Sequence, residues 1–194
     1  MGNAYEGGSL EAWYTFTILG YDGLPGTGDE PHLVTLSFGG GSIDHEGWDE
    51  ESRFLTYLNL FYGSDSPLFL HSAGNGGPGY GTNIAPYPAT ALIVGASTQY
   101  GTANVWGISE TVSYPQRVNW GDVTGFSGRG PGADGRTAVD LVANGMTGTG
   151  AYPLNATRIT DGTRAYVHWY GTSRSVPNMF ASAENEVCTW VSPQ

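Results

Sequence analysis

The chain has 194 residues with an apolar fraction of 39%, enough for one domain with a sizeable core and too apolar for a disordered chain. Its 18 acidic residues outnumber its 7 basic ones, and the net charge of −11 disfavours binding to nucleic acid or to anionic membranes. The lone cysteine, Cys188, excludes an intrachain disulfide, and no apolar run approaches the roughly twenty residues that span a bilayer. We interpret Cys188 as a buried free thiol, with pairing to a second chain as the alternative.

The first helix that the spacing predicts covers residues 9–19, with Ser9 as its cap and Gly20 as its stop. The loop that follows is rich in glycine and carries three acidic side chains: Asp22, Asp29 and Glu30. Oxygen ligands between glycines suit calcium, but the spacing fits no specific calcium-loop pattern. The sequence therefore favours a solvated acidic turn, with structural calcium as the alternative, and it points to no required cofactor.

Short and almost continuous apolar segments predict the strands: residues 33–38, 67–72, 91–97 and 138–143. Residues 49–62, between the first two strands, have apolar side chains at helical spacing behind an acidic first turn. Strands without a polar face are typical of a parallel sheet that helices cover on both faces. The pattern therefore predicts an α/β fold with a mainly parallel sheet.

Residues 99–125 are polar and aromatic without a clear period, which predicts a long surface insert. A glycosylation sequon begins at Asn155, although this pattern is common by chance. The absence of lysine and the low total charge favour an extracellular setting. The residues from Met1 onward lack the charged head and apolar core of a signal peptide, so we expect a secretion signal to lie outside this sequence.

The segment Gly171-Thr172-Ser173 predicts a loop that feeds a helix, because apolar residues recur at helical spacing after it. Unpaired amides and the helix dipole make such a start a natural place for negative charge. Ser173 is therefore either an ordinary helix cap or a nucleophile whose attack creates an oxyanion. The segment alone does not decide between these two interpretations.

Five motifs follow one another in an order that favours the interpretation of Ser173 as a nucleophile. They are Ser37-Phe38-Gly39-Gly-Gly, Ser72-Ala73-Gly74-Asn75-Gly-Gly, Tyr87-Pro-Ala-Thr-Ala-Leu-Ile-Val-Gly-Ala, Phe126-Ser-Gly-Arg-Gly-Pro, and Gly171-Thr172-Ser173 with Pro177. Together they resemble the C-terminal part of a subtilisin-like serine protease domain, and in detail they look most like the pyrolysin and tripeptidyl-peptidase II branch. The resemblance implies a single domain over residues 1–194 with a three-layer subtilisin-like fold that is incomplete at its N-terminus.

The resemblance also implies roles for individual residues. Ser173 matches the nucleophile that forms an acyl-enzyme, and Asn75 matches the side chain that donates to the oxyanion together with the Ser173 backbone N–H. The positions that match the substrate-binding edge and the pocket walls are Ser37, Phe38, Gly39, Ala73, Gly74 and Thr172. The implied substrate is an extended peptide or protein segment, which an exposed strand edge would recognise through its main chain.

Several positions depart from the family pattern. Arg174 stands where the family usually has Met, next to the leaving-group side of the site, and Ser175 and Val176 replace two small residues. Asn178 stands where many members have His, and Asn144 stands where the family has Pro. Arg174 either binds a substrate carboxylate or indicates relaxed selection on the cleft, and the sequence favours neither.

The catalytic Asp and His motifs that precede the Asn loop in this family are absent, and none of the four histidines has the expected neighbours: His32, His45, His71 and His168. One hypothesis is that the missing groups come from upstream sequence or from a complementary chain, so that the isolated chain is inactive. The alternative is a catalytically inactive module that serves as an extracellular structural or assembly protein. A carbohydrate- or calcium-binding module is a weaker third hypothesis, since it leaves the ordered motifs unexplained.

Overall fold

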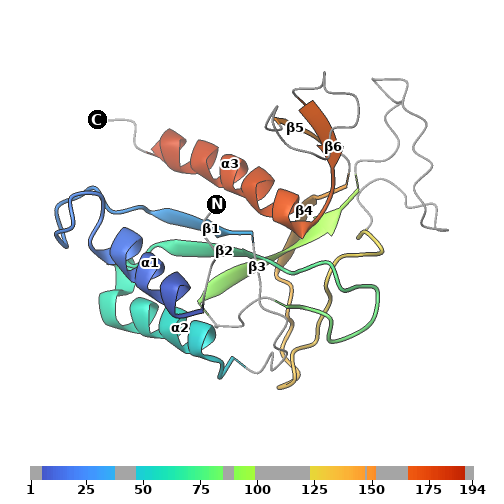
Figure 1. Ribbon diagram of the computed structural model, residues 1–194, viewed down its shortest axis with the longest axis horizontal. Helices are drawn as coiled ribbons and strands as arrows, with labels where there is room; N and C mark the ends of the chain where they lie inside the picture. Colours follow the sequence, from blue (N-terminus) through green and yellow to red (C-terminus); the bar gives the residue numbers. More distant parts are fainter. Residues whose placement is uncertain are drawn as a thin grey trace.

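A parallel four-stranded sheet forms the centre of the fold (Figure 1). The computed structural model describes residues 6–37, 47–84, 90–98, 123–146, 148–151 and 166–190. The strands are β1 (Leu33–Leu36), β2 (Leu68–Ser72), β3 (Ala91–Ser97) and β4 (Leu141–Asn144), and they lie in that order with β1 at one edge. Each neighbouring pair is parallel, as the unbroken apolar segments predict.

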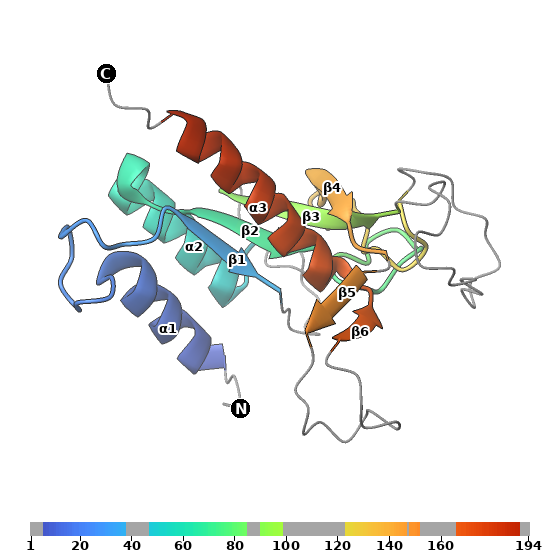
Figure 2. The ribbon, with the colours of Figure 1, turned by 90° about the horizontal axis from the view of Figure 1, so that it is seen from above.

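Helices cover both faces of this sheet (Figure 2). Helices α1 (Glu6–Ile18) and α2 (Glu50–Tyr62) lie on one face, and α3 (Thr172–Trp190) lies across the other. A short 3-10 turn, η1 (Gly63–Asp65), follows α2. The predicted three-layer α/β architecture is therefore confirmed. An antiparallel pair, β5 (Gly148–Ala151) and β6 (Tyr166–Trp169), was not predicted, because the glycines of β5 give no apolar alternation.

Side chains on the two faces of the sheet enter different cores. Between the sheet and α1/α2 lies a cluster with a large aromatic share: Trp13, Ile18, Leu36, Leu55, Leu58, Phe69 and Ala91. Between the sheet and α3 lies a smaller cluster of Leu70, Val94 and Val176. Phe69 and Leu70 are consecutive in β2, so the alternation of a strand sends one to each core.

The predicted helix boundaries are partly correct. Asp49 is the N-cap of α2, because its carboxylate accepts a hydrogen bond from the N–H of Ser52 at 2.7 Å. Helix α1, however, already begins at Glu6, so Ser9 lies inside it and the prediction that Ser9 caps the helix is wrong. Gly20 does follow the helix end with φ 63°, a left-handed conformation that favours glycine.

The acidic loop after α1 uses its carboxylates on its own backbone. Asp29 Oδ2 accepts hydrogen bonds from the N–H groups of Tyr21 and Asp22 at 3.0 and 2.9 Å. The Glu30 carboxylate accepts from the N–H groups of Gly26, Thr27 and Gly28. Backbone N–H groups, that of Glu30 itself first among them, hold the pKa of Glu30 below its usual value. These contacts support the interpretation as a solvated acidic turn.

Some predictions concern residues outside the described part of the chain. They are Phe38 and Gly39, His45, the sequon at Asn155, and most of the insert at 99–125. The backbone places Cys188 in α3 and His168 in β6, but their side chains also lie outside what the structure describes. Within the described ranges, every helix is too short or too polar to cross a membrane.

Candidate active site

Ser173 lies in the first turn of α3, at the edge of the sheet where the parallel strands end. It is the second residue of the helix, and its hydroxyl donates to the backbone carbonyl of Ser37, just after β1, at 2.8 Å. A helix cap would instead accept from an N–H of its own first turn. The interpretation of Ser173 as an ordinary cap is therefore wrong.

Pro177 explains why Ser37 and Ser173 form two hydrogen bonds rather than one. In a regular helix, the N–H of residue 177 would donate to the carbonyl of Ser173, but proline has no N–H. The hydroxyl of Ser37 donates to that carbonyl instead, at 3.1 Å. This contact was not predicted from the sequence, although Pro177, four residues after Ser173, was its signal. The pair fixes the start of α3 against the end of β1.

The Asn75 side chain is oriented by Thr172. Asn75 Oδ1 accepts from the backbone N–H of Thr172 at 2.9 Å and from its hydroxyl at 3.1 Å. The same hydroxyl oxygen accepts from the N–H of Gly74 at 3.0 Å. Because the amide oxygen faces Thr172, the amide nitrogen of Asn75 is directed away from it. Thr172, which is itself fully buried, thus holds the exposed Asn75 loop from below.

Two nitrogen donors border one small space beside Gly171. Gly171 has φ 142°, and a methyl group added to it would lie 3.4 Å from Asn75 Nδ2, 3.6 Å from Asn75 Oδ1 and 3.8 Å from Ser173 N. The Ser173 amide belongs to the first helical turn, where N–H groups have no partner within the helix. N–H donors near a helix N-terminus can stabilise an oxygen anion.

A glycine-rich turn supports the Asn75 loop from behind. Gly128 N donates to Gly74 O at 2.7 Å, and Gly77 N donates to Phe126 O at 2.9 Å. A side chain on Gly128 would lie 2.2 Å from the Ala73 carbonyl oxygen, so the two backbones touch and only glycine fits. This contact gives a physical reason for the Phe126-Ser-Gly-Arg-Gly motif.

Two departures from the family pattern contact each other. Asn178 Nδ2 donates to the carbonyl of Asn144 at 2.6 Å, which ties the second turn of α3 to the end of β4. Arg174 makes a similar tie, since its Nη1 donates to the carbonyl of Met146 at 3.0 Å. The Arg174 side chain is half-buried, and this burial lowers the pKa of its guanidinium.

The structure describes the side chains of two histidines, His32 and His71, and neither of them forms a hydrogen bond with Ser173. His71 is fully buried in β2, where its Nδ1 lies 2.9 Å from Ser72 O, and burial lowers its pKa to about 4. It follows Phe69 by two residues, so it faces the α1/α2 core, on the opposite side of the sheet from α3. His32 is exposed at the far end of β1. These positions agree with the interpretation of His71 as structural.

Of the eight predicted site residues, the structure describes six, and it brings five of these together and buries the sixth. Ser173, Asn75, Ser37, Gly74 and Thr172 are linked by the hydrogen bonds above. Ala73 is adjacent, but its side chain is fully buried.

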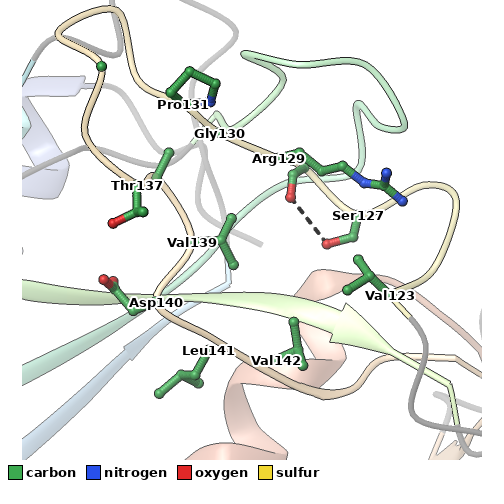
Figure 3. Close-up of a pocket in the computed structure, with 13 residues that line it drawn as sticks. Val123, Ser127, Arg129, Gly130, Pro131, Thr137, Val139, Asp140, Leu141 and Val142 are labelled. Atoms are coloured by element: carbon green, nitrogen blue, oxygen red, sulfur yellow. Dashed lines mark hydrogen bonds between the residues drawn. The ribbon is translucent and has the colours of Figure 1, made fainter.

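A separate cavity of about 1130 Å³ lies beyond the glycine-rich turn (Figure 3). Val123, Val139 and Val142 lie around it, as do residues 129–131 of the turn. Asp140 also lines this cavity, and its carboxylate accepts a hydrogen bond from the N–H of Ile93 in β3 at 2.7 Å. None of the candidate site residues that the structure describes lines this cavity.

Comparisons with known proteins agree with this fold. The family model Peptidase S8, the Subtilase family, matches residues 20–183. Among solved structures, the subtilase cytotoxin SubAB assembly matches with TM-score 0.52 and 16% identity, over 91% of this chain and 49% of that chain. A lanthipeptide protease matches with TM-score 0.50 and 13% identity, over 76% and 44% of the two chains.

A third structure, the S41 psychrophilic protease, matches with TM-score 0.48 and 19% identity, over 76% of this chain and 40% of that chain. The chain thus spans less than half the length of these solved chains. No curated protein sequence is similar enough to count as a relative. Because the family model covers most of the sequence and includes both Asn75 and Ser173, the chain belongs to the subtilase family, a lineage of serine peptidases.

Proposed function

We propose that this chain is the nucleophile- and oxyanion-bearing part of a subtilisin-like serine endopeptidase. Ser173 would attack a peptide carbonyl to form an acyl-enzyme, and the oxyanion would accept hydrogen bonds from Asn75 Nδ2 and Ser173 N–H. The observation that carries the proposal is the small space beside Gly171, which both nitrogen atoms border. The family membership supports the reaction class.

The chemistry requires a base that the described site does not supply. The Ser173 proton is directed at the carbonyl of Ser37, and a backbone carbonyl is not basic enough to remove it. Attack on a substrate requires this hydrogen bond to be replaced by one to an imidazole. We therefore propose that the catalytic Asp and His come from upstream sequence or from a complementary chain, and that the isolated chain is inactive.

The open edge of β1 is where such a piece would pair. Within the described sheet, β1 pairs with β2 on one side only, so its other edge has unpaired N–H and C=O groups. Ser37 follows β1 directly and contacts Ser173. A parallel strand added at this edge would end beside Ser37, and a His after it would be within reach of the Ser173 hydroxyl.

The substrate would be an extended peptide or protein segment. Ser37, Phe38 and Gly39 would form one wall of its binding site, and Ala73, Gly74 and Thr172 would form or support the facing wall. Gly74 and Thr172 are held to each other by a hydrogen bond at 3.0 Å, which supports a rigid wall. We further propose that this chain belongs to the pyrolysin and tripeptidyl-peptidase II branch and that residues 99–125 form a surface insert. We also propose that the chain is the C-terminal part of a longer domain and that the protein is extracellular.

One observation favours a second function. The Ser173 hydroxyl is already satisfied by Ser37, which is also the arrangement that an inactive module would keep. Such a module would use the open β1 edge for assembly with other chains. The two functions differ in whether Ser173 reacts once a base is present.

Chemical rescue tests the proposal. The 194-residue chain is treated with a fluorophosphonate, with and without added imidazole as a substitute base, and the labelled residue is identified by mass spectrometry. We expect slow labelling that imidazole accelerates, at Ser173 only, and none in Ser173→Ala. Asn75→Ala should slow labelling on the order of 10²–10³-fold, a magnitude measured on subtilisin, which belongs to this same family.

Two results would contradict the proposal. The first is no labelling of Ser173 at any imidazole concentration, which would favour the inactive module. The second is labelling that Asn75→Ala leaves unchanged, which would remove Asn75 from the oxyanion site. Rapid labelling without imidazole would instead contradict the need for a complementary piece.

A further inference from the structure

We infer that Arg174 makes this site selective for substrates that carry a carboxylate on the leaving-group side of the scissile bond. The inference rests on the proposed peptidase function and adds the class of substrate. It follows from the position of Arg174, from its hydrogen bonds and from the charges around it.

Position is the first argument. Ser173 contacts Ser37 at the end of β1, on the side where the acyl part of a substrate would pair. The Arg174 guanidinium reaches the other way, to the carbonyl of Met146 after β4. Strands β1 and β4 are the two outer strands of the described sheet, so these contacts lie on opposite sides of the nucleophile. If the acyl part of the substrate pairs beside Ser37, Arg174 faces the leaving group, as the family resemblance also implies for the residue after the nucleophile.

The hydrogen-bonding capacity of Arg174 is the second argument. A guanidinium has five N–H donors in a planar fork, and among the residues that the structure describes this one has a single acceptor, Met146 O at 3.0 Å. The bond to Met146 fixes the plane of the fork while leaving donors for a ligand. A carboxylate is the group whose two oxygen atoms match such a fork.

Charge is the third argument. Within the described ranges the one ion pair joins Arg136 to Asp134, so no carboxylate there neutralises Arg174. Its side chain is nevertheless half-buried, and arginine remains protonated in proteins. A partly desolvated cation without a counter-ion is stabilised when an anion binds. The anion can be an Asp or Glu side chain just after the scissile bond, or the C-terminal carboxylate of a substrate that ends there.

Peptide α-ketoamides test the inference, because the ketone is placed at Ser173 and the next residue is thereby fixed on the leaving-group side. Four compounds are compared with imidazole present: the next residue is Asp, Asn, glycine with a free carboxylate, or glycine amide. Dissociation constants are measured for the parent chain and for Arg174→Met, Arg174→Lys and Arg53→Met. Arg53 is an exposed residue of α2, on the opposite face of the sheet, so it cannot reach the site. Because each variant loses one arginine, Arg53→Met has the same net charge as Arg174→Met.

We expect the parent and Arg53→Met to bind at least one carboxylate compound about tenfold or more tightly than its neutral partner, as hydrogen bonds to charged groups imply. Arg174→Met should lose this preference, and Arg174→Lys should keep part of it, because an ammonium lacks the fork. The compound that shows the preference identifies the carboxylate as a side chain or as a terminus. Circular dichroism confirms that each variant is folded.

Adducts at Ser173 without any carboxylate preference in the parent would overturn the inference and leave the proposed function intact. A preference that persists in Arg174→Met would also overturn it, because another residue would then bind the carboxylate. If no compound forms an adduct with the parent, the proposed function fails and the inference fails with it.

Discussion

The two faces of the sheet are held to their helices in different ways. On the α1/α2 face, large side chains such as Trp13 and Phe69 fill the space, with ring centroids 6.5 Å apart. On the α3 face the buried apolar cluster is smaller, and polar groups at the helix start bond to the ends of the strands. Hydrophobic burial is strong but has no direction, whereas a hydrogen bond fixes an orientation.

This difference separates stability from function. We expect most of the folding free energy to come from the α1/α2 face, because stabilisation follows the apolar area that is buried. The α3 face carries the candidate site, where the positions of Ser173 and Asn75 matter more than the area buried. Three sets of variants test this difference between the two faces.

The largest expected effect is in the α1/α2 core. Leu58 of α2 is 0% exposed, so Leu58→Ala should lower the free energy of unfolding by about 2–5 kcal/mol, from lost burial and the cavity left behind. Leu60, in the same helix, is 78% exposed, and Leu60→Ala should change it by less than about 0.5 kcal/mol. Urea denaturation measures both. Equal effects would contradict the assignment of the core to this face.

The second effect is a pH dependence from His71. Its pKa is about 4 in the folded chain against an ordinary value of 6.5, so the unfolded chain binds a proton more readily. The contribution of neutral His71 to the free energy of unfolding is therefore complete above pH 6.5 and is lost as the pH falls toward 4. Because one pKa unit is worth about 1.4 kcal/mol, this contribution amounts to about 3 kcal/mol. Denaturation of the parent and His71→Asn between pH 4 and 7 measures it.

The variant at His71 should have a flatter pH profile than the parent even if it is less stable at pH 7. His32→Asn provides the control, since His32 is exposed, and it should keep the slope of the parent. A His71→Asn profile parallel to that of the parent would show that other groups cause the pH dependence.

The smallest effect lies on the α3 face and tests the role of Pro177. Ser37→Ala should cost about 1 kcal/mol, because the Ser173 carbonyl loses the hydroxyl that replaces its helical partner. In a Pro177→Ala background, residue 177 regains an N–H that can bond to this carbonyl. The cost of Ser37→Ala should then be smaller, and a double-mutant cycle measured by urea denaturation gives the difference. Additive effects would show that the two residues are not coupled.

The sequence alone was sufficient to predict the parallel sheet and its helices and to name candidate site residues. Apolar segments predicted the four parallel strands, and the apolar spacing over residues 49–62 behind an acidic turn predicted α2. These features depend on neighbouring residues, so a local pattern contains the information. Family motifs brought Asn75 and Ser173 into one hypothesis, and the structure links them through Thr172.

The tertiary structure decided what depends on residues far apart in the chain. Ser37 and Ser173 are separated by 136 positions, and no local pattern shows that one hydroxyl replaces the N–H that Pro177 lacks. The same holds for the contact of Asn178 with Asn144 and for the burial of His71 on the face away from α3. The sequence determined which residue types stand at the ends of the strands; only packing decided which of them meet, because each such contact depends on the registry of the helices on the sheet.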